Sequence, residues 1–165
     1  NDCVPGDVAS VEIIKSKKKF AEGRVVELIR DSPFRSMPQC NYFGICGGCS
    51  WQNLNYERQL YYKQKRVEDA FKFIGGFENI SIAPIIRAES EYRYRNKMEF
   101  SFAEEQWIPE KDFLEQKNYS QTETHQKIFL GLHPFNNWKK IIDIKECCIQ
   151  STFGNQIVKI GRAHV

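Results

Sequence analysis

Three cysteines stand within ten residues of one another in the segment CNYFGICGGCSW. Their spacing is Cys40-x5-Cys46-x2-Cys49, and Gly47 and Gly48 fill the shorter gap. Glycine permits backbone angles that a Cβ forbids, so a tight turn here can bring two sulfurs to one centre and aim main-chain N–H groups at them. Thiolates at such spacing are typical ligands of a tetrahedral zinc ion or an iron–sulfur cluster, and each of these needs a fourth ligand.

The fourth ligand has two candidates, Cys147 and Cys148, which lie about a hundred residues further on. Cys3 is isolated near the start of the chain and is a poor candidate. Zinc sites usually pair one CxxC with a second CxxC or with two histidines, so a leading cysteine, one CxxC and one distant cysteine favour a cluster. Zinc remains the competing interpretation, and a redox dithiol formed by Cys46 and Cys49 is a third, although no βαβ pattern surrounds them.

A basic segment near the start of the chain predicts a surface that contacts RNA phosphates, with an aromatic ring that can stack on a base. An ordinary solvated turn is the alternative. The residues concerned are Lys15, Lys17, Lys18, Lys19 and Phe20.

The segment YRYRNK (92–97) alternates aromatic and basic side chains. In a strand, Tyr92 and Tyr94 would share one face, with Arg93 and Arg95 on the other. Such an arrangement suits RNA, whose bases stack on rings and whose phosphates pair with arginine. A strand at a sheet edge with a polar face is the alternative.

The chain has 165 residues, 41% of them hydrophobic, a net charge of +3 and six cysteines. This length suffices for one domain or two small ones. No apolar run approaches the ~20 residues of a membrane span, and no secretory signal pattern begins the chain. We therefore expect thiols kept reduced in the cytoplasm, with no membrane and no obligate protein partner. No GxGxxG or P-loop is present, and the three histidines are scattered.

The expected elements are of the α+β class. VASVEII and RVVELI predict a β-hairpin, and a helix is expected to begin after Asn55 and to end at Gly75 and Gly76. Four later segments have strand composition: SIAPIIRA, YRYRNKMEFSFA, KIFLGLHPF and KKIIDIKECCI. Residues 104–126 predict a long polar excursion, and HPFNN predicts a turn between the last two strands.

The last six residues, IGRAHV (160–165), follow no periodicity and are similar to the translation of a sequencing adapter. We set them aside as a non-native tail, and we expect the reading frame to be truncated.

The segment CNYFGICGGCSWQNLNYERQLYYKQKRVEDAF resembles the iron–sulfur region of bacterial 23S rRNA (uracil-5-)-methyltransferases, members of the RNA uracil-C5 methyltransferase family. YRNKMEFSF and GLHPFNNWKKIIDIKECCIQS are similar to two further segments of that family. In the family an aliphatic residue follows the fourth cysteine after one other residue, which selects Cys147, with Ile149 as the aliphatic.

The resemblance implies a [4Fe–4S] cluster held by Cys40, Cys46, Cys49 and Cys147. It also implies ribosomal RNA as partner and methyl transfer from S-adenosylmethionine to uracil C5, by a catalytic domain that this chain lacks. The fold implied is a partial OB-like TRAM β-barrel, a cluster loop, one helix and a mixed or antiparallel β central domain. The expected boundaries are 1–34 for the partial TRAM domain, 35–54 for the linker and iron–sulfur loop, 55–159 for the helix and RNA-binding β domain, and 160–165 for the tail.

Overall fold

The structure is a computed structural model that describes residues 3–108, 128–135 and 137–164. The chain forms two compact units. The first, which we call the hairpin unit, combines Asn1–Pro38 with Trp51–Glu89. The second, the cysteine unit, combines Gln39–Ser50 with Ser90–Val165. Each unit is therefore built from two stretches of chain, and the cysteine-rich loop belongs with residues that follow it at a distance.

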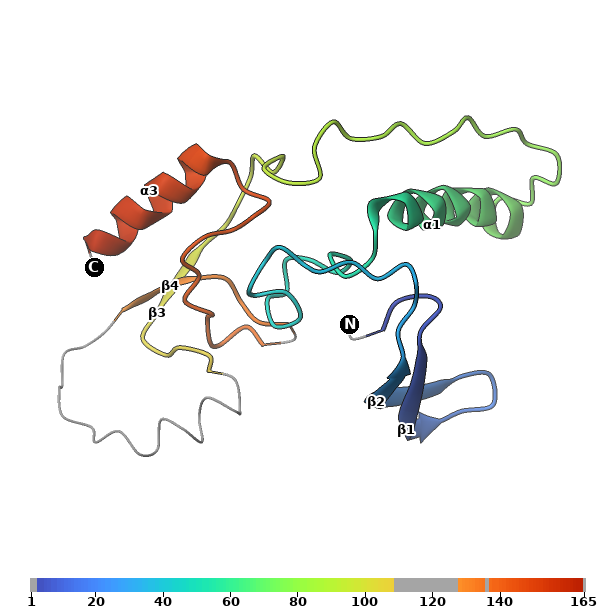
Figure 1. The fold of residues 1–165 in the computed structure, drawn as a ribbon, viewed down its shortest axis with the longest axis horizontal. Coiled ribbons are helices and arrows are strands. Elements are labelled where there is room, and N and C mark those ends of the chain that lie inside the picture. Colours follow the sequence, from blue (N-terminus) through green and yellow to red (C-terminus); the bar gives the residue numbers. More distant parts are fainter. Residues whose placement is uncertain (1–2, 109–127, 136, 165) are drawn as a thin grey trace. The chain divides into compact units, whose positions relative to one another are not determined.

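The hairpin unit begins with strands β1 (Val8–Ser16) and β2 (Ala21–Arg30), which pair antiparallel (Figure 1). The main-chain N–H of Lys17 donates to the Phe20 carbonyl at 2.8 Å and closes the connecting turn. The predicted hairpin is thus confirmed. Most of its apolar side chains are exposed, as an isolated two-stranded sheet requires. The OB-like barrel stays a prediction.

The base of the hairpin is organised by Asp7, whose side chain is 2% exposed. Its carboxylate accepts the main-chain N–H groups of Val4 at 2.6 Å and Ser32 at 2.8 Å. It also accepts a bidentate pair from Arg35, at 2.9 Å from Nε and 2.8 Å from Nη2. One carboxylate therefore ties together the residues before β1, those after β2 and the next turn.

Helix α1 spans Tyr56–Asp69 and continues as a π-helical turn, η1, over Ala70–Ile74. Asn55 caps it by accepting the N–H of Arg58 at 3.0 Å, as predicted. Gly75 ends it, also as predicted. Among the apolar residues of α1 and η1 only Leu60 is buried, while Ile74 at the far end is 88% exposed.

The prediction of a strand over SIAPIIRA is wrong, because residues 80–88 are extended but pair with no strand. They run beside α1 instead, as Figure 1 shows. The Ala88 N–H donates to the Tyr56 hydroxyl at 2.9 Å, and Arg87 pairs with Glu57 at 2.6 Å. A helix side chain thus accepts a main-chain hydrogen bond that a neighbouring strand would accept in a sheet.

The cysteine unit contains strands β3 (Ser101–Ala103) and β4 (Phe129–Gly131), which pair antiparallel. The segment after β4 approaches residues 141–142, since Leu132 and Ile142 form an antiparallel bridge. This bridge confirms the antiparallel course of the last two predicted strand segments, although the regular strands are shorter than expected. The core gathers here, and its buried members are Leu130, Ile141, Ile142, Ile144, Cys147 and Ile149.

Helix α3 (Thr152–Ala163) was not predicted. Ser151 caps it by accepting the N–H of Gly154 at 3.0 Å. The helix includes residues 160–163, which belong to the segment expected to be a non-native tail. Arg162 lies in it and donates to the carbonyls of Leu130 and Ile144, each at 2.7 Å. The non-native origin of residues 160–165 stays a prediction.

The mixture of small antiparallel sheets and helices confirms the α+β class. The excursion predicted for residues 104–126 falls mostly outside the described residues. Over the part of the chain that is described, no helix is long and apolar enough to cross a membrane.

Candidate metal centre

The cysteine-rich loop is attached by main-chain hydrogen bonds to the segment that follows β4. The N–H of Gly47 donates to the His133 carbonyl at 3.1 Å, and that of Phe135 donates to the Ile45 carbonyl at 3.0 Å. Cys46 therefore sits in an antiparallel bridge with Pro134. A Cβ on Gly47 would lie 3.4 Å from the His133 carbonyl oxygen, an ordinary van der Waals contact, so the spacing here does not itself require glycine.

His133 itself supports this attachment. Its Nδ1 lies 3.2 Å from the Lys140 carbonyl and its Nε2 lies 3.2 Å from the Ser101 hydroxyl. With the proton on Nδ1, the ring donates to the carbonyl and accepts from the hydroxyl, which satisfies both nitrogens. These contacts give His133 a structural role in this turn.

The loop also reaches the segment that carries the tandem cysteines. The main-chain N–H of Lys145 donates to the Tyr42 hydroxyl at 3.1 Å. The thiol of Cys148 donates to the Gln39 carbonyl at 3.7 Å. Residues more than a hundred positions apart are thereby brought together in one unit by hydrogen bonds of the protein alone.

The main chain at Cys147 is also held by hydrogen bonds from two side chains outside the cysteine-rich loop. Asn155 is 4% exposed and bonds both main-chain polar groups of Cys147, accepting from the N–H at 2.9 Å and donating to the carbonyl at 3.0 Å. Arg93 donates to the same carbonyl at 3.1 Å and to that of Gln150 at 3.2 Å. Its guanidinium also pairs with Glu146 at 2.5 Å, so Arg93 braces the whole turn.

These contacts correct the expected strand over residues 92–97. Arg93 has φ 61°, a left-handed conformation that interrupts an extended chain. Its N–H bonds the Cys148 carbonyl at 3.1 Å, and the N–H of Arg95 bonds the Ile149 carbonyl at 2.8 Å. The alternation of faces predicted for Tyr92 and Tyr94 therefore does not occur. RNA contacts by Arg93 and Arg95 stay a prediction, and both residues are exposed.

The thiols of the motif lie within electrostatic range of one another. Burial raises the pKa of Cys40, and the nearby thiols of Cys148 and Cys147 add to the rise. Burial likewise raises the pKa of Cys46, which feels Cys49, Cys40 and Cys147. The N–H of Gly48 donates to the Cys46 sulfur at 3.4 Å and opposes part of that rise. These thiols therefore lie near enough to affect one another's pKa, and their role as metal ligands stays a prediction.

The donor set fits a thiolate-bound metal. Four sulfurs in one unit, a main-chain N–H on one of them and a buried fourth cysteine match what zinc or a cubane cluster requires. As the side chains stand, no group of three or more His, Cys, Asp or Glu residues among those described is arranged to hold a metal ion. Binding would therefore need the thiols to move toward a common centre.

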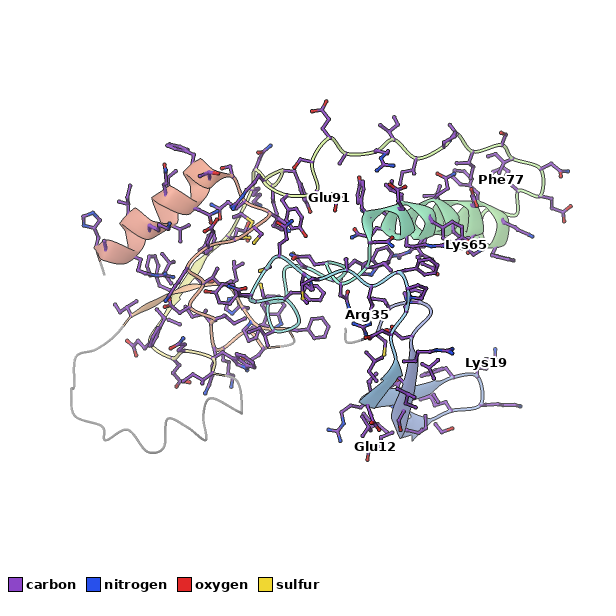
Figure 2. The ribbon with its side chains drawn as sticks, viewed as in Figure 1. Glu12, Lys19, Arg35, Lys65, Phe77 and Glu91 are labelled. Carbon is purple, nitrogen blue, oxygen red and sulfur yellow. The ribbon has the colours of Figure 1, made fainter. Side chains whose placement is uncertain are left out.

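The predicted RNA contacts at the hairpin tip belong to the other unit. Lys17 lies with its Nζ 5.2 Å from the centre of the Phe20 ring, and that ring is 51% exposed. Figure 2 shows Lys19 on the same loop, at the outside of the hairpin. The tip presents clustered positive charge and an exposed aromatic face to solvent, and its contact with RNA stays a prediction.

Sequence reasoning missed two contributors to the candidate centre: Asn155 and the bracing role of Arg93. A signal existed for the first. Ser151 is a good N-cap, and Phe153, Ile157 and Ile160 follow a helical spacing that predicts α3 and hence a fixed place for residue 155. The second depends on contacts between distant segments and has no local signature.

Comparison with known proteins gives close relatives, although no family model matches the chain. An "uncharacterized RNA methyltransferase" of Bacteroides thetaiotaomicron is 37% identical over 93% of this chain and 33% of its own length. Proteins of the same name from Chlorobaculum tepidum and Porphyromonas gingivalis are 35% and 36% identical, over 96% and 93% of this chain and 32% of their own lengths. The chain thus spans about a third of the length of these curated relatives. Along nearly its whole length, it is homologous to a region of proteins named RNA methyltransferases.

Proposed function

We propose that this chain is the RNA-binding, iron–sulfur part of an S-adenosylmethionine-dependent enzyme that methylates uracil C5 in 23S rRNA in the cytoplasm. The observation that carries the proposal is the gathering of Cys40, Cys46, Cys49 and Cys147 in one unit, in a chain whose relatives are named RNA methyltransferases. The chemical step belongs to the part of such proteins that this chain does not match.

Within this proposal the chain's own residues bind and orient. The cysteine unit would hold a [4Fe–4S] cluster through its four thiolates, and the cluster would cross-link the loop to the turn before α3. The hairpin tip would contact RNA phosphates through its lysines and a base through Phe20. The resulting RNA-bound front end would present a uracil to a catalytic domain, which would flip the base out of its stack to reach it.

Anaerobic reconstitution of the reduced chain with iron and sulfide tests the cluster. About four iron and four acid-labile sulfide per chain are expected, with the broad visible absorption of a cubane. Cys46→Ser should lose both, because ligation and ordering of the loop are coupled. Cys3→Ser is the matched control, since Cys3 is an exposed cysteine of the hairpin unit and should leave binding intact.

A zinc-stabilised RNA-binding module without enzymatic activity is the second candidate, favoured by the same four sulfurs, because tetrahedral sites with four cysteine ligands are common for zinc. If the chain contains one zinc and no labile sulfide, the site is a zinc site and not an iron–sulfur cluster. The uninterrupted reading frame of the source DNA then separates enzyme from module, because the enzyme requires a catalytic domain in the same polypeptide.

A further inference from the structure

One arginine of helix α1 lies against aromatic rings. The guanidinium carbon of Arg58 is 3.7 Å from the centre of the Phe34 ring and 5.6 Å from the centre of the Tyr61 ring. All three residues belong to the hairpin unit, and Arg58 is half-buried. Aromatic faces attract a guanidinium and stack on its plane, so this side chain has a defined position.

The main chain builds this contact through Asn55. The N–H of Asn55 donates to the Phe34 carbonyl at 2.9 Å, and its side chain accepts the N–H of Arg58 at 3.0 Å. The N–H of Phe34 in turn donates to the Ser32 hydroxyl at 3.1 Å. The cap of the helix thus fixes both the ring and the residue that stacks on it.

The hydrogen-bond donors of Arg58 are not used inside the described part of the chain. Over these residues, no hydrogen bond or ion pair engages its guanidinium. The carboxylates nearest to Arg58 and Phe34 in the sequence are paired elsewhere, Glu57 with Arg87 at 2.6 Å and Asp31 with Arg35 at 3.2 Å. A ring on the face of a guanidinium leaves the five N–H donors at its edge available.

We propose that Arg58 binds a backbone phosphate of single-stranded RNA, in addition to the lysines of the hairpin tip. The planar fork of a guanidinium matches two oxygens of one phosphate, which a lysine cannot do. The ring of Tyr61 is exposed beside it and can stack on a neighbouring base. The inference rests on the proposed function and deepens it, because it adds a residue that holds the RNA backbone.

The experiment measures binding of the whole reduced chain to a labelled single-stranded RNA oligonucleotide, by fluorescence anisotropy at several salt concentrations. Arg58→Ala should weaken binding about tenfold, the effect of one charge-assisted hydrogen bond. It should also lower the slope of log K against log salt by about 0.7. Arg58→Lys keeps the charge and therefore the slope, yet it should weaken binding about threefold because the fork and the stack are lost.

Arg66 provides the matched control. It is an exposed arginine in the last turn of the same helix, and it lies against no aromatic ring of the described residues. Arg66→Ala should weaken binding far less than Arg58→Ala, and Arg66→Lys should bind as the wild type does. Circular dichroism verifies that α1 is intact in each variant. If Arg58→Ala folds poorly, Arg58→Lys decides the question, because it keeps a long cationic side chain.

Equal RNA affinity of Arg58→Lys and the wild type, or equal losses in the Arg58 and Arg66 variants, would overturn the inference, since the stacked fork would then contribute nothing of its own. Iron uptake and the tip lysines test the proposed function separately. Binding that depends on the tip lysines and not on Arg58 overturns the Arg58 site alone. Binding that depends on Arg58 in a chain that takes up no iron keeps this site and removes the cluster. A chain that binds no RNA overturns both.

Discussion

The side chain of Asn155 bonds both main-chain polar groups of Cys147, its Oδ1 accepting the N–H at 2.9 Å and its Nδ2 donating to the carbonyl at 3.0 Å. Both groups are buried, so no water replaces a lost partner. Because Asn155 also lies in the first turn of α3, this pair fixes the predicted fourth ligand to a helix.

Replacing Asn155 should therefore loosen the Cys147 turn. Asn155→Leu leaves the buried Cys147 N–H without a partner, while the carbonyl keeps its bond from Arg93, at a cost of about 2 kcal/mol. Hydrogen exchange at the Cys147 amide should accelerate by at least about tenfold at that cost. Asn155→Asp keeps the acceptor for the amide and should exchange more slowly than the leucine variant. Gln156→Ala, an exposed neighbour on α3, should leave exchange unchanged, and equal effects of all three would contradict this role.

Gly131 should tolerate no side chain. A Cβ there would come within 1.8 Å of the Ile142 carbonyl oxygen, which is part of the backbone pairing at the centre of the cysteine unit. Gly131→Ala should destabilise this unit by about 3 kcal/mol, since the backbone must move apart.

The matched control is Gly161→Ala in α3, where the nearest atom to an added Cβ is a Leu130 methyl at 3.7 Å. This change should stabilise the helix by up to about 1 kcal/mol, from the difference in helix propensity. Urea unfolding monitored by exchange of the β3–β4 amides distinguishes the two variants. A neutral Gly131→Ala would show that β4 and residues 141–142 do not approach this closely.

Asp7 should make the stability of the hairpin unit depend on pH. Its hydrogen bonds from Arg35, with those from Val4 and Ser32, lower its pKa from 3.8 to about 2. A carboxyl group whose pKa is depressed on folding stabilises the fold above its unfolded pKa. That contribution should therefore be complete above about pH 4 and should disappear as the pH falls toward about 2.

Asp7→Asn should remove this dependence and destabilise the unit at pH 7 by about 2 kcal/mol, since it also breaks a pair with Arg35. Thermal unfolding followed between pH 2 and 7 measures both effects. Glu12→Gln serves as control, because its pair with Arg24 is solvent-exposed and contributes little. If wild type and Asp7→Asn showed the same pH profile, the assignment to Asp7 would fail.

Removing the charge of the hairpin tip should weaken RNA binding in a salt-dependent manner. Substituting Lys17, Lys18 and Lys19 by alanine should lower the slope of log K against log salt by about 2, since each phosphate contact contributes about 0.7 to 0.9. Titration of an rRNA fragment at several salt concentrations measures the slope. The matched control removes equal charge from α1 and η1 by Lys63→Ala, Lys65→Ala and Lys72→Ala.

The control lysines are all exposed, and Figure 2 labels Lys65, whose Nζ lies 3.3 Å from Asp69. We expect the control to change the slope by less than half as much as the tip variant. Equal slopes for both variants would mean that RNA responds to net charge and not to the hairpin tip.

Elements with local signals were predictable from sequence. The hairpin, the Asn55 cap and the glycine at the end of α1 each depend on residues within a few positions of one another, so propensity and capping decide them. The residues of the cysteine motif were predictable too, because their spacing alone indicates metal chemistry. Helix α3 also had a local signal, in Ser151 and in the apolar spacing after it. It was not predicted because residues 160–165 were interpreted as a non-native tail.

The tertiary structure decided what distant segments do to one another. Residues 80–88 and 92–97 both have strand composition. In the first segment a main-chain N–H donates to a helix side chain, and in the second the left-handed conformation of Arg93 interrupts the extended chain. Composition could not foresee this, because β propensity describes a half-buried surface and depends on which partner is available. The approach of the cysteine-rich loop to the segment that carries the tandem cysteines is of the same kind. Sequence determined which sulfurs are present, and only folding, which closes a loop of more than a hundred residues, brought the two segments together.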